Sequence, residues 1–353
     1  MIFLKIWKKY ILKETLLFIL FFLTAIYIVY FTLDISVHST RIFSSNVKYF
    51  DVLIYYYHNF ILQLNLFLPL SFILAIIKVV YKMNKKNELL TLQMGGISKY
   101  KFSIPFFFIA YLLSMISYYN LEYLSPNSYD KIEKFKNDYV RKEKRKKTSL
   151  STILLKDNTK IIYQKYDYSK KQLLDVFYIK SSDDIWHIKY LNTEKPYMGY
   201  FADHFKRDNS GKLKKIKSFK NYSFDLSKKV SSSFLPIEKK AISQLFLQYI
   251  NKKFISNKEK AVLLTNLNFK IASPLIYFLI VLSIFPFCIK FSRSNKSFLI
   301  FAISIFSFIF FYTLMDAMII LAENNIGSPF WITWSPYILS FIIFSFKFFN
   351  KNS

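Results

Sequence analysis

The sequence is poor in the residues that build disulfide frameworks, phosphate-binding loops and metal centres. It contains one cysteine, Cys288, and five glycines among 353 residues. A single cysteine excludes a disulfide framework and any metal site with several cysteine ligands. The one Gly-Lys pair, Gly211-Lys212, is followed by Leu213 and has no upstream glycine, so it is not a nucleotide-binding loop. We therefore expect the chain to hydrolyse no nucleotide itself.

Candidate catalytic groups are also scarce. The four histidines, His38, His58, His187 and His204, lie at unrelated positions without metal-ligand spacing. No serine lies in a nucleophile-elbow context, and no carboxylates are paired as in glycosidases or proteases. These absences predict a protein with no active site of its own, no metal and no cofactor.

Acidic residues are few: 22 Asp and Glu stand against 50 Lys and Arg, which gives a net charge of +28. Clustered basic side chains attract phosphates of any kind. Lys, Ile, Asn and Phe are however abundant together, as in proteins from AT-rich genomes, so composition alone accounts for part of the charge. We expect no nucleic-acid partner.

Apolar residues are plentiful, at 53% of the chain, and they are gathered into six blocks. Each block is about as long as the roughly 20 residues that cross a hydrocarbon core of about 30 Å. Inside that core the backbone must satisfy its own hydrogen bonds, so each block should be a helix. The first block lacks a small-residue cleavage site, and we expect it to be retained. The blocks are residues 16–33, 62–80, 102–119, 271–289, 298–321 and 331–349.

The arrangement of the blocks predicts an integral membrane α-helical protein of three helices, an extramembrane domain and three more helices. The expected boundaries are 1–120, with a cytoplasmic segment at 82–100, then 121–268 and 269–353. Lys and Arg mark the cytoplasmic side of short connections. They are frequent near both termini, in 82–101 and in 290–296, and absent from 322–330. We therefore expect both termini inside and the large domain outside.

The extramembrane segment changes to a period of two after the basic run at 141–147. Asn, Asp, Ser and Gly separate the runs, notably at 208–211, as in tight turns between antiparallel strands. Short strands at this spacing predict a small sandwich, a jelly roll or an open barrel. An amphipathic helix at 236–254 would pack on the sheet or lie at the membrane surface. The expected strands are 152–155, 160–166, 174–179, 185–190, 199–205 and 218–224.

The connection at 85–98 is the most informative segment. Asn87 is expected to cap a short helix, Glu88 lies in its first turn, and Gly95-Gly96 ends it. A capped connector with Glu88 favoured by the helix dipole is the ordinary interpretation. The pattern of Asn-Glu-Leu, a glycine turn, Ile-Ser and the next span nevertheless resembles the coupling segment of the LptF/LptG permease family. Shorter matches are Leu68-Pro69, Leu124-Ser125-Pro126, the strand pair at 155–163 and residues 269–274.

The resemblance implies a fold, a function and partners. Its members supply six helices and a periplasmic β-jelly roll, and two paralogous subunits extract lipopolysaccharide from the inner membrane of Gram-negative bacteria for outer-membrane biogenesis. A cytoplasmic ABC ATPase, LptB, supplies the energy, and LptC, with a single span, passes the lipid to a periplasmic bridge. The resemblance implies an ATPase-coupling role for Glu88, Leu89, Leu92, Gly95 and Gly96.

A lipid with several acyl chains and phosphates needs an apolar wall beneath a basic rim. The outer end of the first helix offers both, with Arg41 and Lys48 as partners for phosphates; for either residue taken alone, interfacial snorkelling is the favoured interpretation. Inward-facing strand residues would line a groove for acyl chains. The expected lipid-binding residues are Tyr30, Phe31, Asp34, Arg41, Lys48, Ile162, Phe177 and Ile188.

Two other classes of protein remain open. A secondary lipid or solute transporter would carry paired ionisable residues at mid-membrane or matching broken spans. Only Pro69, Pro286 and Asp316 point that way, and they form no pair. A membrane scaffold for envelope assembly would present the outer domain to partners, and it would copurify without an ATPase or a second permease.

Overall fold

The structure, a computed structural model, describes most of the chain. The segments described are 6–42, 49–136, 151–154, 159–167, 172–181, 183–193, 196–208, 213–224, 237–251, 257–289 and 297–349. All statements below refer to these residues. The basic run at 141–147 and the turn residues 209–211 lie outside them.

Six helices within the described residues are long and apolar enough to cross a membrane. All six apolar blocks expected from the sequence coincide with them, the fourth block ending one residue beyond its helix, so the prediction of six apolar helices of membrane-spanning length is confirmed. In chain order, the strands follow the third span and precede the fourth. The spans are Ile6–Val37, Tyr49–Lys85, Tyr100–Glu133, Lys260–Cys288, Phe298–Glu323 and Pro329–Phe349.

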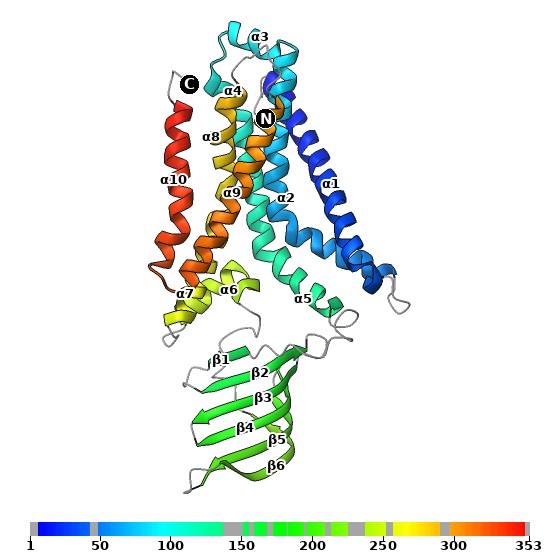
Figure 1. Cartoon of the computed structure of the whole chain (residues 1–353), viewed down its shortest axis with the longest axis vertical. Helices are drawn as coiled ribbons and strands as arrows, with labels where there is room; N and C mark the ends of the chain where they lie inside the picture. Colours follow the sequence, from blue (N-terminus) through cyan, green and yellow to red (C-terminus); the bar gives the residue numbers. More distant parts are fainter. Residues whose placement is uncertain are drawn as a thin grey trace.

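The spans are built from the helices drawn in Figure 1. The first two are single helices. The third runs through a π-helical turn, η1, and the fourth passes through a 3₁₀ turn at Pro274. The elements are α1 (Ile6–Ile42), α2 (Tyr49–Lys85), α4 (Lys99–Tyr119), η1 (Asn120–Leu124), α5 (Ser125–Phe135), α7 (Asn257–Ala272), η5 (Ser273–Leu275), α8 (Ile276–Cys288), α9 (Ser297–Glu323) and α10 (Pro329–Phe349).

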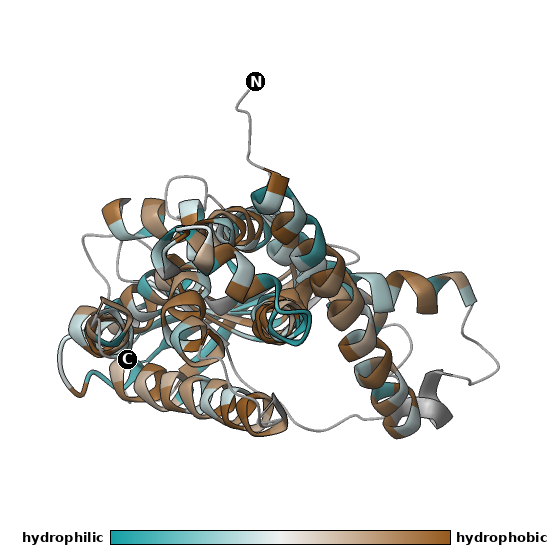
Figure 2. Ribbon diagram, turned by 90° about the horizontal axis from the view of Figure 1, so that it is seen from above, coloured by the Kyte–Doolittle hydropathy of each residue, from teal (hydrophilic) through white to brown (hydrophobic). Residues whose placement is uncertain are grey.

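The core of the bundle lies between α2, α4 and α8. Phe72, Phe106, Tyr277 and Phe285 are almost completely buried there. In contrast, few residues of α1, α9 and α10 are buried, and Figure 2 shows that hydrophobic residues, in brown, make up much of the helices. An exposed apolar surface of this extent is what a lipid-facing helix requires.

A single antiparallel sheet lies beyond one end of the bundle, with β1 nearest the helices and β6 farthest away (Figure 1). All six strands expected from the sequence are present. The strands follow one another in an up-and-down order, so the crossovers of a jelly roll are not seen among them, and that topology stays a prediction. The strands are β1 (Ser151–Leu154), β2 (Lys160–Asp167), β3 (Gln172–Ser181), β4 (Asp184–Asn192), β5 (Met198–Arg207) and β6 (Leu213–Ser223).

A row of unpaired positions crosses the sheet. Asp175 and Phe201 adopt left-handed backbone conformations, with φ of 52° and 54°, and the ladder is interrupted at each of them. In a regular strand, residues three positions apart face opposite sides of the sheet. Ile188 and Leu191 lie on either side of this row and are nevertheless both buried, so the alternation shifts by one residue there. Strict alternation of side chains therefore fails across the middle of the sheet.

The buried face of the sheet is closed by Phe224, which follows β6. Its ring makes edge contacts with Tyr178 and Trp186, and its amide donates to the carbonyl oxygen of Tyr197 at 2.9 Å. The ring lies directly over Gly199: a Cβ atom there would be 2.6 Å from Phe224 Cε2 and 3.1 Å from Ile188 Cγ2. Glycine at 199 is thus required by the close approach of this ring.

We predict that Gly199→Ala destabilises the sheet by about 1–3 kcal/mol, the usual cost of overpacking a filled core. The measurement is the temperature at which residues 159–224 become cleavable by protease in the detergent-solubilised protein. Gly95→Ala is the matched control, because its nearest contacts would be ordinary ones at 3.4 Å. Combining Gly199→Ala with Phe224→Leu should recover part of the loss; an unchanged temperature for the single variant would contradict the packing.

Candidate functional site

The short helix α3 (Glu88–Met94) joins α2 to α4 at the end of the bundle where both termini lie, opposite the sheet (Figure 1). Asn87 does not cap α3 through its side chain, contrary to the sequence prediction. It has a left-handed φ of 58° and makes no side-chain cap hydrogen bond. Asparagine tolerates this conformation and turns the chain directly after α2.

The end of α3 is fixed by backbone hydrogen bonds. The Gly96 amide donates to the Gln93 carbonyl at 3.0 Å, and the Ile97 amide donates to the Leu92 carbonyl at 3.1 Å. With Gly96 at φ 80° this is a Schellman motif, in which glycine supplies the left-handed residue. Gly95-Gly96 therefore ends the helix, as the sequence predicts.

The predicted coupling residues divide into two groups. Leu89 is 2% exposed and belongs to the core of the bundle, and Leu92 packs against that core. Gly95 and Gly96 are exposed. The outward-facing apolar side chain is instead Met94, at 87% exposed, which the sequence argument did not select. A lone methionine in a short helix gave no periodic signal by which to find it.

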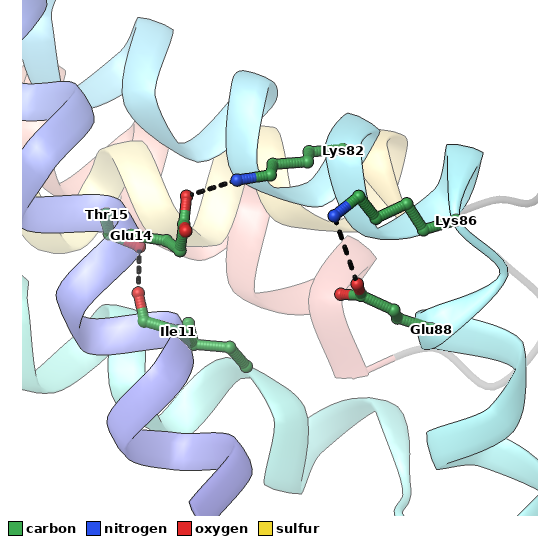
Figure 3. Close-up of polar contacts among 6 residues, drawn as sticks. All are labelled: Ile11, Glu14, Thr15, Lys82, Lys86 and Glu88. Atoms are coloured by element: carbon green, nitrogen blue, oxygen red, sulfur yellow. Dashed lines mark hydrogen bonds and ion pairs between the residues drawn. The ribbon is translucent and has the colours of Figure 1, made fainter.

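Charged side chains connect α3 with the ends of α1 and α2 (Figure 3). Lys82 Nζ of α2 donates to Glu14 Oε2 of α1 at 2.8 Å, and Lys86 Nζ lies 3.9 Å from Glu88 Oε1. The Tyr10 phenol lies within hydrogen-bonding reach of the Glu88 side chain and within range of the charges of Lys82 and Glu14. Three helix ends thus share one polar cluster, and its Lys82–Glu14 pair is largely shielded from solvent, with side-chain exposures of 32% and 20%.

Glu88 is incompletely satisfied. Its Oε2 atom is buried and has no hydrogen-bond partner among the described residues. A buried acceptor without a donor costs about 1–3 kcal/mol, and more if it is charged. The 3.9 Å contact with Lys86 is too long for a hydrogen bond. The Glu88 side chain as a whole is nevertheless 33% exposed, so part of it remains accessible from outside the described chain.

The predicted lipid residues of α1 contact α2. Asn59 Nδ2 donates to the Tyr30 hydroxyl at 2.9 Å, and Tyr56 donates its hydroxyl proton to Asp34 Oδ2 at 3.0 Å. The Phe31 ring lies edge-on to Tyr56 at 4.6 Å between centroids. These three residues stay partly exposed while they tie together the parts of α1 and α2 that lie toward the sheet. The side chain of Arg41 and the whole of Lys48 lie outside the described residues.

The three strand residues do not share a face of the sheet. Ile162 lies opposite Phe177 in the register, and Phe177 lies opposite His187. Ile188 lies opposite Val176 on the other face and is fully buried beneath the closed side of the sheet. The expectation that all three line one interior is therefore wrong; Phe177, at 38% exposed, is on the accessible face.

The accessible face of the sheet also carries paired charges. His187 Nε2 lies 2.6 Å from Asp175 Oδ1, and Lys215 Nζ lies 2.8 Å from Asp203 Oδ1. The hydrogen bond from the Lys215 ammonium holds the pKa of the Asp203 carboxyl below its ordinary value. Within the described residues, no group of three or more His, Cys, Asp or Glu is placed to hold a metal ion.

Two features of the later spans complete the description. Asp316 of α9 is exposed, and no partner for it is found in the part of the chain that the structure describes. A cavity of about 720 Å³ opens between α8, α9 and α10 and is lined mainly by apolar side chains. Ser283 and Ser335 in its wall each donate to a carbonyl of their own helix at 3.2 Å.

These observations define a multi-pass membrane protein with an inserted antiparallel sheet domain. A family model described as the lipopolysaccharide export system permease LptF/LptG matches residues 9–350. The chain therefore belongs to the LptF/LptG family, a family of transport subunits, and the resemblance found in the sequence is confirmed. A search of curated proteins finds no match.

We predict that Leu89→Ala and Met94→Ala separate the two roles of α3. Leu89→Ala should lower the free energy of unfolding by about 2–5 kcal/mol, because it leaves a cavity in the bundle core. Met94→Ala should leave it unchanged, because that side chain contacts solvent. Thermal unfolding of the purified chain in one detergent measures both; equal melting temperatures for the two variants would contradict the assignment of Leu89 to the core.

Proposed function

We propose that this chain is one permease subunit of an ABC-type lipopolysaccharide exporter, driven by a separate cytoplasmic ATPase that docks on α3. The observation that carries the proposal is the polar cluster at Glu88. A partner that supplies a cation to the accessible part of the Glu88 side chain would bind the cluster that joins α1, α2 and α3. The family match supports the transport class, and the ATPase is the finer inference.

The surface of α3 supports docking of a protein partner. Thr91, Gln93 and Met94 are exposed on a helix whose opposite side is held in the bundle by Leu89. An exposed apolar anchor beside an unsatisfied charge is the combination found at the energetic centre of interfaces. We propose Glu88 and Met94 as the direct contacts, with Leu89 and Leu92 holding the helix and Gly95-Gly96 ending it.

We propose the inner membrane as the location, with both termini and α3 in the cytoplasm and the sheet in the periplasm. The termini and α3 lie at one end of the bundle and the sheet lies at the other. Lys82, Lys85 and Lys86 at the α3 end agree with the cytoplasmic excess of basic residues. Thiol labelling from the outside of cysteines placed at Asp208 and Asn350 would test this orientation.

We further propose that three spans lie in residues 1–120, the extramembrane domain in 121–268 and three more spans in 269–353. The proposed partners are a paralogous permease and an LptC-like single-span protein. The outer ends of α1 and α2, with Tyr30, Phe31, Asp34 and Arg41, would receive the lipid, together with Lys48 beyond α1. The accessible face of the sheet, with Ile162 and Phe177, would then carry acyl chains, while Ile188 supports that sheet from its closed side.

A secondary transporter is the second candidate, and one observation favours it: the unpaired Asp316 within α9. A charged side chain in a span costs about 2.5–3.5 kcal/mol on insertion scales unless it faces protein or water. The permease proposal accounts for Asp316 by contact with another subunit. Transport that persists in purified chain without ATP or ATPase would favour the secondary transporter.

We predict that Glu88→Ala lowers lipopolysaccharide-stimulated ATP turnover of the reconstituted complex by about tenfold or more, which corresponds to about 1.4 kcal/mol or more of coupling. Glu88→Lys should lower it further, because it repels the proposed cation. Turnover is measured with equal amounts of assembled complex. Asp183→Ala, another exposed acidic residue but at the β3–β4 turn, is the matched control. Normal stimulation in both Glu88 variants would refute docking at this carboxylate.

We predict that photo-crosslinking groups at Ile162 and Phe177 capture lipopolysaccharide when ATP is supplied, whereas a group at Ile188 does not. The reason is the register of the sheet, which places Ile162, half-buried, and Phe177, exposed, on one face and the buried Ile188 on the other. Crosslinks are scored by immunoblot for the lipid in the assembled complex, with an ATP-free sample as the control. Capture at Ile188 alone would place the lipid on the closed face and overturn the proposed path.

A further inference from the structure

The helix α6 (Ile242–Asn251) lies between the strands and the fourth span, beside α7 at the sheet-facing end of the bundle (Figure 1). One side of it is packed into the protein: Ile242, Leu245 and Gln248 are at most 6% exposed. The other side is apolar as well. Phe246, Leu247, Tyr249 and Ile250 are 42–59% exposed. A ten-residue helix in water would not carry four large apolar side chains on its open side.

Hydrogen bonds to Glu122 of η1 fix the position of α6 along the length of the bundle. The Glu122 carboxylate accepts hydrogen bonds from the backbone amide of Ser243, at 3.2 Å, and from its hydroxyl. These bonds hold the first turn of α6 against η1, where α4 passes into α5 within the third span. A carboxylate at this position also satisfies the free amides and the positive end of the helix dipole.

Glu122 lies within a belt of exposed aromatic residues. Tyr119 and Tyr123 are 55% and 58% exposed on the same turn, and their ring centroids are 5.2 Å apart. Trp331, 65% exposed, begins α10 at the same end of the bundle. Tyr and Trp gather at the boundary between headgroups and acyl chains. The Glu122 bonds therefore place α6 at that boundary, continuous with the lipid-facing surface of the spans.

We infer that α6 is an in-plane membrane anchor whose Phe246, Leu247, Tyr249 and Ile250 face is inserted in the lipid of the outer side of the bilayer. The sequence left open whether this segment packs on the sheet or lies on the membrane. Helices of this kind sit about 5–10 Å into the boundary of headgroups and acyl chains. The anchor connects the sheet domain to the fourth span through a segment that lipid itself holds in place.

Spin labels test the anchor in the full chain reconstituted in nanodiscs of phosphatidylethanolamine and phosphatidylglycerol. Single cysteines replace Phe246, Leu247 or Ile250 in a Cys288→Ala background and carry a nitroxide. Collision rates with oxygen, which partitions into lipid, and with a water-soluble nickel complex give the depth of each label. Ile309 on α9 is the lipid reference and Lys217 on β6 is the water reference, because both are exposed on the described surface.

The expected result is that labels at 246, 247 and 250 collide with oxygen more often than with the nickel complex, at depths between the two references. Gln244, on the polar edge of the same helix, is the matched control and should read shallower. Nickel collisions as frequent as at Lys217 would show that the face lies in water and overturn the inference. Low collision rates with both reagents would show that protein covers the face, and would overturn it equally.

Discussion

The burial of α2 is the constraint on which the rest of the molecule depends. A helix inside the membrane satisfies its own backbone, so its side chains alone decide what it packs against. α2 packs against α1, α4, α5, α8 and α9. Its middle, around Phe72 and Ile76, is completely buried. The two ends of α2 therefore have fixed positions in the bundle, and so do the elements that contact them, α3 at one end and α5 at the other.

Polar contacts are concentrated at these two ends. At one end Lys82 meets Glu14 near Glu88, and at the other Tyr56 meets Asp34 and His58 Nδ1 lies 3.0 Å from the buried Ser128 hydroxyl of α5. The Lys82–Glu14 pair is only partly shielded from water, so it fixes the relative placement of α1 and α2 more than it adds to stability. Apolar packing determines which helices are neighbours, and these polar pairs determine how far α1 and α5 are shifted along α2.

The sequence was sufficient where the physical signal is periodic or long. Six apolar blocks and six alternating runs predicted the spans and strands, because both periods report directly on burial. It failed where one residue departs from its usual conformation. Asp175 and Phe201 take left-handed conformations that no composition rule indicates, and they change which face the following side chains occupy. The grouping of Ile162 and Phe177 with Ile188 failed for a related reason: sequence shows that strands alternate but not which face of each is closed.

The same limit explains the result at α3. Glu88 and the glycine turn are recognisable in the sequence because each has a chemical or conformational signature. Whether Leu89 or Met94 faces outward depends on the angle at which α3 leaves α2, and Asn87 sets that angle by a single positive φ. A seven-residue helix is too short for its apolar positions to reveal this orientation.

The insertion of Leu89 into the bundle has a mechanical consequence. Two residues separate α2 from α3, and four residues, which include the Schellman glycine and the Ser98 cap, separate α3 from α4. Such a short connector cannot lengthen. A force applied to Met94 is therefore transmitted to the ends of α2 and α4, because α3 has little freedom to slide or fray. The connection between α2 and α4 is therefore rigid. Its rigidity comes from three residues, Leu89, Asn87 and Gly96.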